Sequence, residues 1–306
     1  MQKSIIILII VILIGAGIYF FMTQGSSDEP VVPETEDTTT DTTEPTDGDQ
    51  TDQTGDAQEP GESVIGTSVE GRDITAYHYG TGETELLLVG GIHGGYAWNT
   101  SLVAYEAADY FNENPDAIPD NMRVTVIPVL NPDGLNKTIG TDGRFTKADV
   151  PSSQEAVTTG RFNANGVDLN RNFDCNWEPT GTWQERTVDG GSKAFSEPES
   201  LAFKNYVATH NPSATVVWYS AAGGVFASSC STGILPETRT IMNVFADASG
   251  YPAYDEFNFY ELTGDMANWL SRVGVPTVSI LLSTHSDVEW SENKAGIMAL
   301  LDHYAK

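Results

Sequence analysis

The sequence predicts an α/β domain with a mixed, mostly parallel central sheet that is flanked by helices. Strand-like and helix-like segments alternate along residues 63–306, and this alternation is typical of a sheet covered by helices. Several strand-like segments are nearly continuous apolar, β-branched runs, as expected for strands that are buried on both faces. In such folds a binding site is expected at the carboxyl ends of the strands.

Five segments are expected to form strands and five to form helices. The predicted strands cover residues 74–79, 85–92, 123–130, 215–220 and 277–283. The predicted helices cover residues 100–112, 197–210, 237–249, 265–273 and 293–304. Residues 196–199 have the pattern of a capping box with proline in the first turn, which marks the start of the second helix. In the third helix Ile241 and Phe245 recur at helical spacing, which indicates a core-facing side.

An unbroken apolar run covers residues 5–22 and follows Lys3. Its length is close to the minimum for a transmembrane helix, and the preceding positive charge predicts a cytoplasmic N-terminus. A cleaved signal peptide is the alternative, but no small-x-small cleavage site follows the run. Residues 1–22 are therefore predicted to be a transmembrane anchor of a single-pass cell-membrane protein whose C-terminal domain is extracytoplasmic.

Residues 23–62 are rich in Thr, Asp, Glu and Pro and contain no Lys or Arg. The segment carries 13 acidic residues and almost no apolar ones, so it cannot bury enough surface to fold. We interpret it as a disordered linker between the anchor and a domain formed by residues 63–306.

The chain has 43 acidic and 15 basic residues, a net charge of −28. Without the linker and Lys3, residues 63–306 still contain 30 acidic and 14 basic residues, a net charge of −16. A domain with this charge does not suit nucleic acid or an anionic membrane surface as a partner.

A long irregular segment covers residues 136–193. A long insert of this kind usually shapes a binding cleft.

Cys175 and Cys230 are the two cysteines of the chain, and outside the cytoplasm they can form a disulfide. Two unpaired buried thiols are the alternative.

Asn170 and Arg171 belong to the stretch GVDLNRNFD, which begins at Gly166. An arginine binds a carboxylate through two charge-assisted hydrogen bonds, and an asparagine adds another donor. This pair is therefore expected to grip a carboxylate. In the alternative interpretation Arg161 and Arg171 only hold an acidic loop in place through Asp168 and Asp174.

The residue pattern GVDLNRNFD resembles that of the zinc carboxypeptidases of the M14 family, in which the Asn–Arg pair binds the C-terminal carboxylate of the substrate. Further blocks match the family in the same order, at residues 65–72, 89–95, 126–134, 196–199, 263–269 and 278–285. The resemblance covers nearly all of the domain. It implies the zinc carboxypeptidase fold and a zinc-dependent peptidase that removes C-terminal residues.

The metal site that the resemblance implies is a His-x-x-Glu pair and a distant histidine. His93 matches the first ligand, whereas the glutamate position holds Tyr96, or Ala97 if the loop is one residue longer. Tyr219 stands at the position of the distant histidine. A phenol with a pKa near ~10 is a poor zinc ligand at neutral pH, and one imidazole holds zinc weakly. Zinc is therefore expected to be weakly bound or absent.

The resemblance places the glutamate that acts as general base at Leu281, which cannot accept a proton. Losing a positioned base typically lowers the rate by a factor of about 10²–10⁴. Because the metal-ligand positions are also replaced, no catalytic residue is expected to be intact. His285 and Asp287 follow the same predicted strand and could supply a reorganised ligand set. A structural role for His285 is the simpler interpretation.

The residues that the resemblance assigns to substrate binding are better preserved. Arg161 is similar to the arginine that polarises the scissile carbonyl, although it could also simply pair with Asp168. Tyr260 matches the mobile tyrosine that covers the bound end. Asp265 and Ala267 fall near the positions that set side-chain preference, and the charge of Asp265 would favour a basic side chain such as lysine or diaminopimelate.

These observations favour a membrane-anchored M14 domain that is catalytically inactive and binds the C-terminal carboxylates of peptides or cell-wall peptides. One alternative is an active zinc carboxypeptidase with an atypical ligand set. A third hypothesis is a scaffold whose cleft no longer binds a ligand.

Overall fold

The computed structural model describes residues 61–231 and 233–305. Its strands are β1 (Gly61–Thr67), β2 (Asp73–Gly80), β3 (Thr84–Val89), β4 (Met122–Ile127), β5 (Thr180–Trp183), β6 (Arg186–Asp189), β7 (Ala214–Ser220), β8 (Gly224–Ala227), β9 (Ser229–Cys230), β10 (Gly233–Ile234), β11 (Ala253–Tyr254) and β12 (Thr277–Leu282). Its α-helices are α2 (Trp98–Glu113), α3 (Pro132–Ile139), α4 (Gln154–Thr159), α5 (Pro198–His210), α6 (Pro236–Ser249), α7 (Met266–Arg272) and α8 (Trp290–Tyr304).

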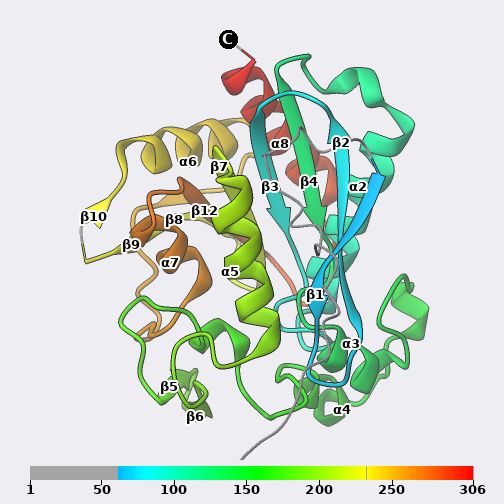
Figure 1. Cartoon of the computed structure of the whole chain (residues 1–306), viewed down its shortest axis with the longest axis vertical. Coiled ribbons are helices and arrows are strands. Elements are labelled where there is room, and N and C mark those ends of the chain that lie inside the picture. Colours follow the sequence, from blue (N-terminus) through cyan, green and yellow to red (C-terminus); the bar gives the residue numbers. More distant parts are fainter. Residues whose placement is uncertain (1–60, 232, 306) are drawn as a thin grey trace, which may run out of the picture. The chain divides into compact units, whose positions relative to one another are not determined.

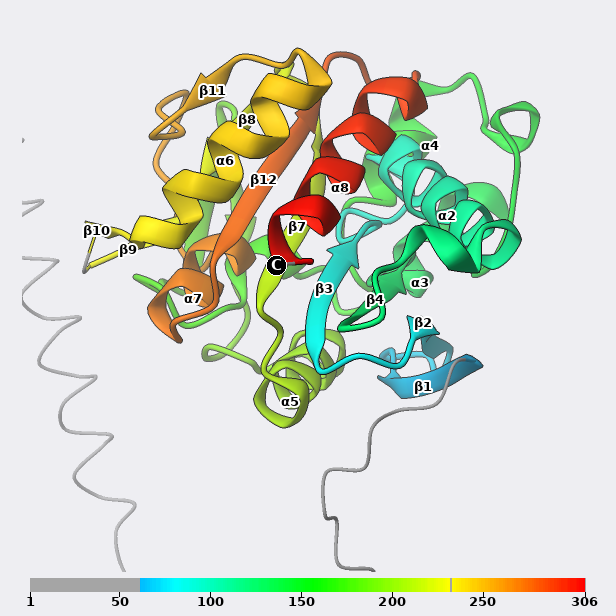
Figure 2. The same cartoon turned by 90° about the horizontal axis from the view of Figure 1, so that it is seen from above.

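The described part of the chain forms an eight-stranded sheet in the order β1-β2-β4-β3-β7-β12-β8-β11 (Figures 1 and 2). The central strands β4, β3, β7 and β12 run parallel to one another. Antiparallel pairs join β1 to β2, β2 to β4 and β8 to β12. The predicted mixed, mostly parallel sheet is therefore confirmed, and each of its five predicted strands and five predicted helices has a counterpart.

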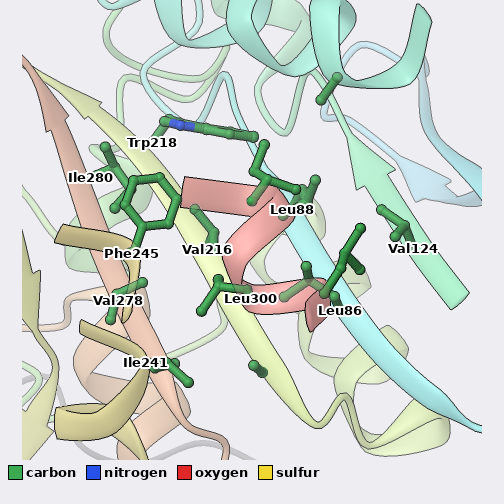
Figure 3. Close-up of a cluster of buried hydrophobic side chains, with 14 of the residues drawn as sticks. Leu86, Leu88, Val124, Val216, Trp218, Ile241, Phe245, Val278, Ile280 and Leu300 are labelled. Carbon is green, nitrogen blue, oxygen red and sulfur yellow. The ribbon is translucent and has the colours of Figure 1, made fainter. Parts of the chain in front are cut away.

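Helices cover both faces of the sheet, and the alternation of side chains along each strand divides the core in two. In β3, Leu86 and Leu88 pack in the cluster that contains residues of α2, α6 and α8. Leu87 and Val89 pack in the second cluster, with residues of α5 and α7. Figure 3 shows part of the first cluster, where Trp218 of β7 lies among aliphatic side chains. Each fully buried Leu, Val, Ile or Phe side chain stabilises the folded state by roughly 1.5–3 kcal/mol relative to an exposed one.

The same alternation turns Tyr219 of β7 and Leu281 of β12 toward the face that α5 and α7 cover. These two residues are direct partners in the parallel register of the two strands. Sheet geometry thus brings together two positions that lie 62 residues apart in the sequence.

Two details differ from the sequence predictions. Helix α5 begins at Pro198, and its N-cap, Glu197, makes no side-chain capping bond. The predicted capping box at residues 196–199 is therefore wrong, because Glu199 instead accepts hydrogen bonds from Val69 N and Asn163 Nδ2. Strand β1 begins at Gly61, so residues 61 and 62, which we assigned to the linker, belong to the folded domain.

The predicted transmembrane anchor (residues 1–22) and the rest of the predicted linker (residues 23–60) lie outside the described residues. Among the residues that the structure does describe, no helix combines the length and the apolar character needed to span a bilayer.

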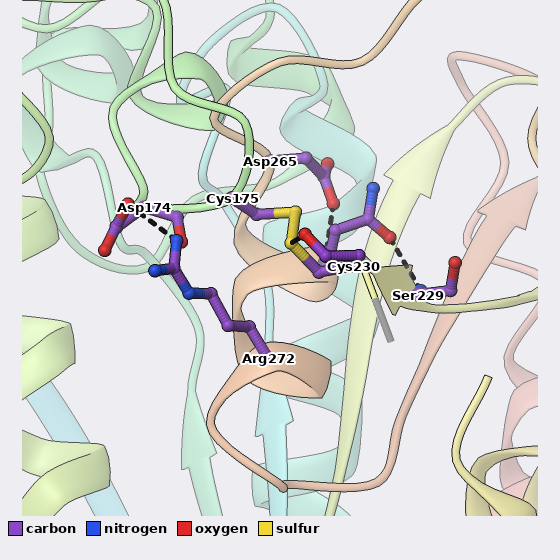
Figure 4. Close-up of a disulfide and its surroundings, with 8 residues drawn as sticks. Asp174, Cys175, Ser229, Cys230, Asp265 and Arg272 are labelled. Atoms are coloured by element: carbon purple, nitrogen blue, oxygen red, sulfur yellow. Dashed lines mark hydrogen bonds and ion pairs between the residues drawn. A yellow bond between two sulfur atoms is a disulfide. The ribbon is translucent and has the colours of Figure 1, made fainter. Parts of the chain in front are cut away.

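Cys175 and Cys230 form a disulfide with a Cα–Cα distance of 6.0 Å, which confirms the predicted bridge (Figure 4). It links the loop after residues 169–171 to β9. Next to it, Gly264 N donates a hydrogen bond of 2.8 Å to Cys175 O. The disulfide therefore secures the segment that leads into α7.

Replacing both cysteines with serine should lower the free energy of unfolding by about 4 kcal/mol, because the bridge closes a long loop, with a separation of 55 residues, and so restricts the unfolded chain. Urea unfolding of the oxidised protein and of the double variant measures this difference. A reducing agent should destabilise the native protein and leave the double variant unaffected. Equal stability of the two oxidised proteins would contradict the prediction.

Candidate functional site

A cavity of about 940 Å³ opens where several sheet strands end. Its wall includes His93, which follows β3, as well as Tyr219 of β7 and Leu281 of β12. The hairpin formed by β5 and β6 and the segment at residues 255–262 complete the wall. The cavity therefore lies at the carboxyl ends of parallel strands, as predicted, and part of the long insert at 136–193 lines it.

His93 is a buried, neutral imidazole. Its Nε2 lies 3.5 Å from Asp168 Oδ1, but this contact does not have the geometry of a hydrogen bond, so Nε2 has no hydrogen-bond partner. Burial and the nearby charge of Arg161 lower the pKa of His93 to about 4, although Asp168 opposes this shift. The ring centroids of His93 and Tyr219 are 5.9 Å apart.

The two tyrosines at expected ligand positions are also neutral. Tyr219 donates a hydrogen bond of 3.1 Å to Asn170 Oδ1, and burial raises its pKa well above the ordinary value. Tyr96 lines the cavity, and burial raises its pKa as well. Ala97, by contrast, is 1% exposed and does not line the cavity. Of the two candidates for the glutamate position, only Tyr96 therefore lines the cavity.

The residues present do not fit a catalytic zinc site. The positions that should supply two further ligands and a base hold two phenols and Leu281, beside one imidazole. Within residues 61–231 and 233–305, no group of three His, Cys, Asp or Glu side chains could hold a metal ion. His285 lines the cavity and its ring lies 5.1 Å from that of Tyr96, but Asp287 contacts Thr284 and Lys147 instead.

Arg161 and Asp168 form a buried ion pair in the wall of the cavity. Asp168 Oδ2 accepts a hydrogen bond from Arg161 Nε at 2.9 Å and lies 2.8 Å from Arg161 Nη2. Burial raises the pKa of Asp168, but the charge of Arg161 outweighs burial and holds this pKa well below its usual range. The Arg161 guanidinium lies 4.2 Å from the Trp183 ring. The ion pair between Arg161 and Asp168, which was the alternative interpretation of Arg161, is therefore present.

Arg171 lies beneath the β5–β6 hairpin, not in the cavity wall. It is 1% exposed, and its Nη1 and Nη2 donate to Asn170 O at 2.7 Å and to Thr182 O at 2.6 Å. A Cβ atom on Gly181 would lie 2.6 Å from Arg171 Cδ, so only glycine allows the hairpin to approach this closely. Arg171 does not pair with Asp174, which instead binds an arginine of α7.

Asn170 does line the cavity, but its side chain is bonded to Asp265. Asn170 Nδ2 donates to Asp265 Oδ2 at 2.7 Å, and its Oδ1 accepts from Tyr219 and from Met266 N. Asp265 is the N-cap of α7. Burial raises the pKa of Asp265, against the opposing charge of Arg171.

The other two predicted substrate-binding residues differ in their access to the cavity. Tyr260 lines the cavity; its ring lies 4.9 Å from that of Phe257, and the Arg171 guanidinium is 5.8 Å from its centre. Ala267 is buried in the first turn of α7 and does not line the cavity.

Sequence reasoning missed Trp183 and the aromatic rings around Phe257. Trp183 ends the four-residue strand β5 and Phe257 lies in an irregular segment, and neither segment has a periodic pattern long enough to mark a functional side chain. The length of the insert at 136–193 was the one signal that could have pointed to Trp183.

Comparisons with known proteins find similar sequences and a similar fold. The model of the family described as zinc carboxypeptidase matches residues 62–273. A zinc carboxypeptidase of Simulium vittatum is 29% identical over 153 residues, which cover 48% of this chain and 48% of that protein. A gamma-D-glutamyl-L-diamino acid endopeptidase of Lysinibacillus sphaericus is 27% identical over 146 residues, which cover 45% of this chain and 37% of that protein.

A similar fold occurs in the crystal structure of the murein-tripeptide amidase MpaA from Escherichia coli O157. The TM-score is 0.56 at 22% identity, over 79% of this chain and 92% of that one. This chain spans about half or less of the length of the two curated relatives from Simulium vittatum and Lysinibacillus sphaericus.

Proposed function

Since the chain belongs to the zinc carboxypeptidase family, we propose that its domain uses the family cleft to bind peptides or cell-wall peptides without hydrolysing them. The observation that carries this proposal is the donor set of the cavity. His93 stands beside Tyr96, Tyr219 and Leu281, and neutral phenols and an alkyl group cannot replace metal ligands and a general base.

The cavity supports a binding role because it keeps the size and chemistry of a ligand site. A volume of about 940 Å³ lies within the range of ligand pockets, and its wall combines aromatic rings with polar groups. Arg161 is proposed to contact a ligand carbonyl, and Tyr260 to cover the bound segment. One relative is named an endopeptidase for a diamino acid linkage and one structural neighbour a murein-tripeptide amidase, which supports peptides of the cell wall as candidates.

We also propose that the domain lies outside the cytoplasm and is anchored to the cell membrane. The apolar run at residues 5–22 supports an anchor. The disulfide between Cys175 and Cys230 supports an oxidising compartment, because such bonds persist mainly outside the cytoplasm.

Metal content and hydrolysis test this proposal on the purified full chain. We expect no stoichiometric zinc after dialysis against zinc-containing buffer, and no release of C-terminal amino acids from a peptide panel. Binding of the same peptides, followed by isothermal titration calorimetry, should still be detectable. One zinc per chain together with chelator-sensitive hydrolysis would establish the active enzyme instead, and a folded protein that binds none of the peptides would indicate the empty scaffold.

A further inference from the structure

Asp265 is a buried carboxylate that already accepts a hydrogen bond from the Asn170 amide, the group expected to bind a ligand carboxylate. The Asn170 Nδ2 to Asp265 Oδ2 distance is 2.7 Å, and both residues line the cavity. Asp265 is 5% exposed. The Asn170 side chain therefore already binds a carboxylate, and this carboxylate is Asp265 of the same chain.

The orientation of Asn170 is held from both sides. Its Oδ1 accepts hydrogen bonds of 3.1 Å from the Tyr219 hydroxyl and from Met266 N. Rotating the amide to free Nδ2 would turn that donor toward Met266 N–H, so that two donors would face each other. The other oxygen of Asp265 is also engaged, since Oδ1 accepts from Asn268 N at 2.9 Å.

Arg171 does not provide a second place for a ligand carboxylate. Its terminal nitrogens donate to the backbone carbonyls of Asn170 and Thr182, and it does not line the cavity. The Asn–Arg pair that was expected to grip a ligand therefore binds groups of its own chain.

The remaining charged groups of the wall suit a cation better than an anion. Besides Asp265, the acidic residues that line the cavity are Glu185, Glu256, Glu261 and Asp255, of which Asp255 pairs with Arg239. Of the described residues in the wall, Arg161 is the only arginine or lysine, and its Nε and Nη2 are bonded to Asp168. The rings of Phe257 and Tyr260 also line the cavity, and aromatic faces attract ammonium groups.

We infer that Asp265 is a resident anion that keeps ligand carboxylates out of the cavity, so that the site selects peptides with an amino group and no free carboxylate at this position. A ligand carboxylate would have to displace one that holds two donors, and it would meet the negative charge of the wall. This inference rests on the proposed function, because it defines the ligand class of the same cavity.

Two probes that differ only at the carboxyl end test the inference on the full chain: acetyl-glycyl-lysine amide and acetyl-glycyl-lysine with a free acid. We expect the native protein to bind the amide at least about tenfold more tightly than the acid. Asp265→Ser retains an oxygen that can cap α7 but frees Asn170 Nδ2. It should raise the affinity for the acid at least about tenfold. Asp265→Asn keeps the shape of the side chain and should shift the preference in the same direction.

Glu256→Gln is the matched control, because it removes one negative charge from the wall at a residue that does not bond to Asn170. It should weaken binding of the amide and change the ratio of the two affinities far less than Asp265→Ser does, because it leaves the Asn170–Asp265 hydrogen bond in place. Equal binding of both probes by the native protein, or an unchanged affinity of folded Asp265→Ser for the acid, would overturn the inference alone. If no protein binds either probe, the proposed function fails together with it.

Discussion

Replacing Asp168 with asparagine should lower the free energy of unfolding by about 3–5 kcal/mol. The side chains of Asp168 and Arg161 are 0% and 3% exposed, and they are joined by an ion pair and a hydrogen bond. Without the carboxylate charge, the guanidinium stays buried without a compensating anion, which costs far more than the loss of one hydrogen bond. Chemical denaturation followed by intrinsic fluorescence measures the effect.

Asp109→Asn is the control for this substitution, since it breaks an ion pair with Arg144 in which both side chains are 52% exposed. Solvent already screens that pair, so the cost should stay below about 1 kcal/mol. Adding Arg161→Met to Asp168→Asn should recover part of the lost stability, because the unpaired charge is then removed. If Asp168→Asn costs no more than Asp109→Asn, the buried pair does not stabilise the site.

The triple substitution Tyr96→Glu, Tyr219→His and Leu281→Glu should convert the cavity into a zinc site. The cavity wall holds all three positions together with His93, and Leu281 and Tyr219 are register partners on adjacent strands. The variant would supply two imidazoles and two carboxylates, which are good zinc ligands. We expect about one zinc per chain and an affinity at least about 1,000-fold above that of the native protein, or about 4 kcal/mol.

Competition with a chromophoric chelator measures this affinity, and two controls accompany it. In the first, Ala97→Glu replaces Tyr96→Glu; residue 97 is buried outside the cavity, so this variant should bind zinc much more weakly. In the second, His93→Ala is added to the triple variant and should reduce binding again. A folded triple variant that takes up no zinc would show that the family positions have been assigned to the wrong residues.

The sequence was sufficient for most of the fold. Buried strands such as β3 and β7 are continuous apolar runs, and α6 has apolar residues at helical spacing, so local pattern and tertiary packing agree there. The hairpin β5–β6 and the two-residue strands β9 to β11 were not predicted. These short strands depend on partners that are distant in the sequence or on tight turns, and they carry no alternation long enough to detect.

The candidate site was predicted less completely. The positions of His93, Tyr96, Tyr219 and Leu281 followed from short blocks that each lie at the end of a strand, and such blocks are visible in a single sequence. The partners of Asn170 and Arg171 were not visible. Asn170 bonds to Asp265, 95 residues away, and Arg171 bonds to the carbonyl of Thr182 in an unpredicted hairpin.

By itself, the sequence determined which chemical groups this cavity can contain: one imidazole, two phenols and an alkyl chain stand where the resemblance implies metal ligands and a base. Only the tertiary structure decided which donors remain available to a ligand. The physical reason is that a side chain carries its hydrogen-bonding capacity in its covalent structure, whereas the use of that capacity depends on which group the fold brings within about 3 Å of it.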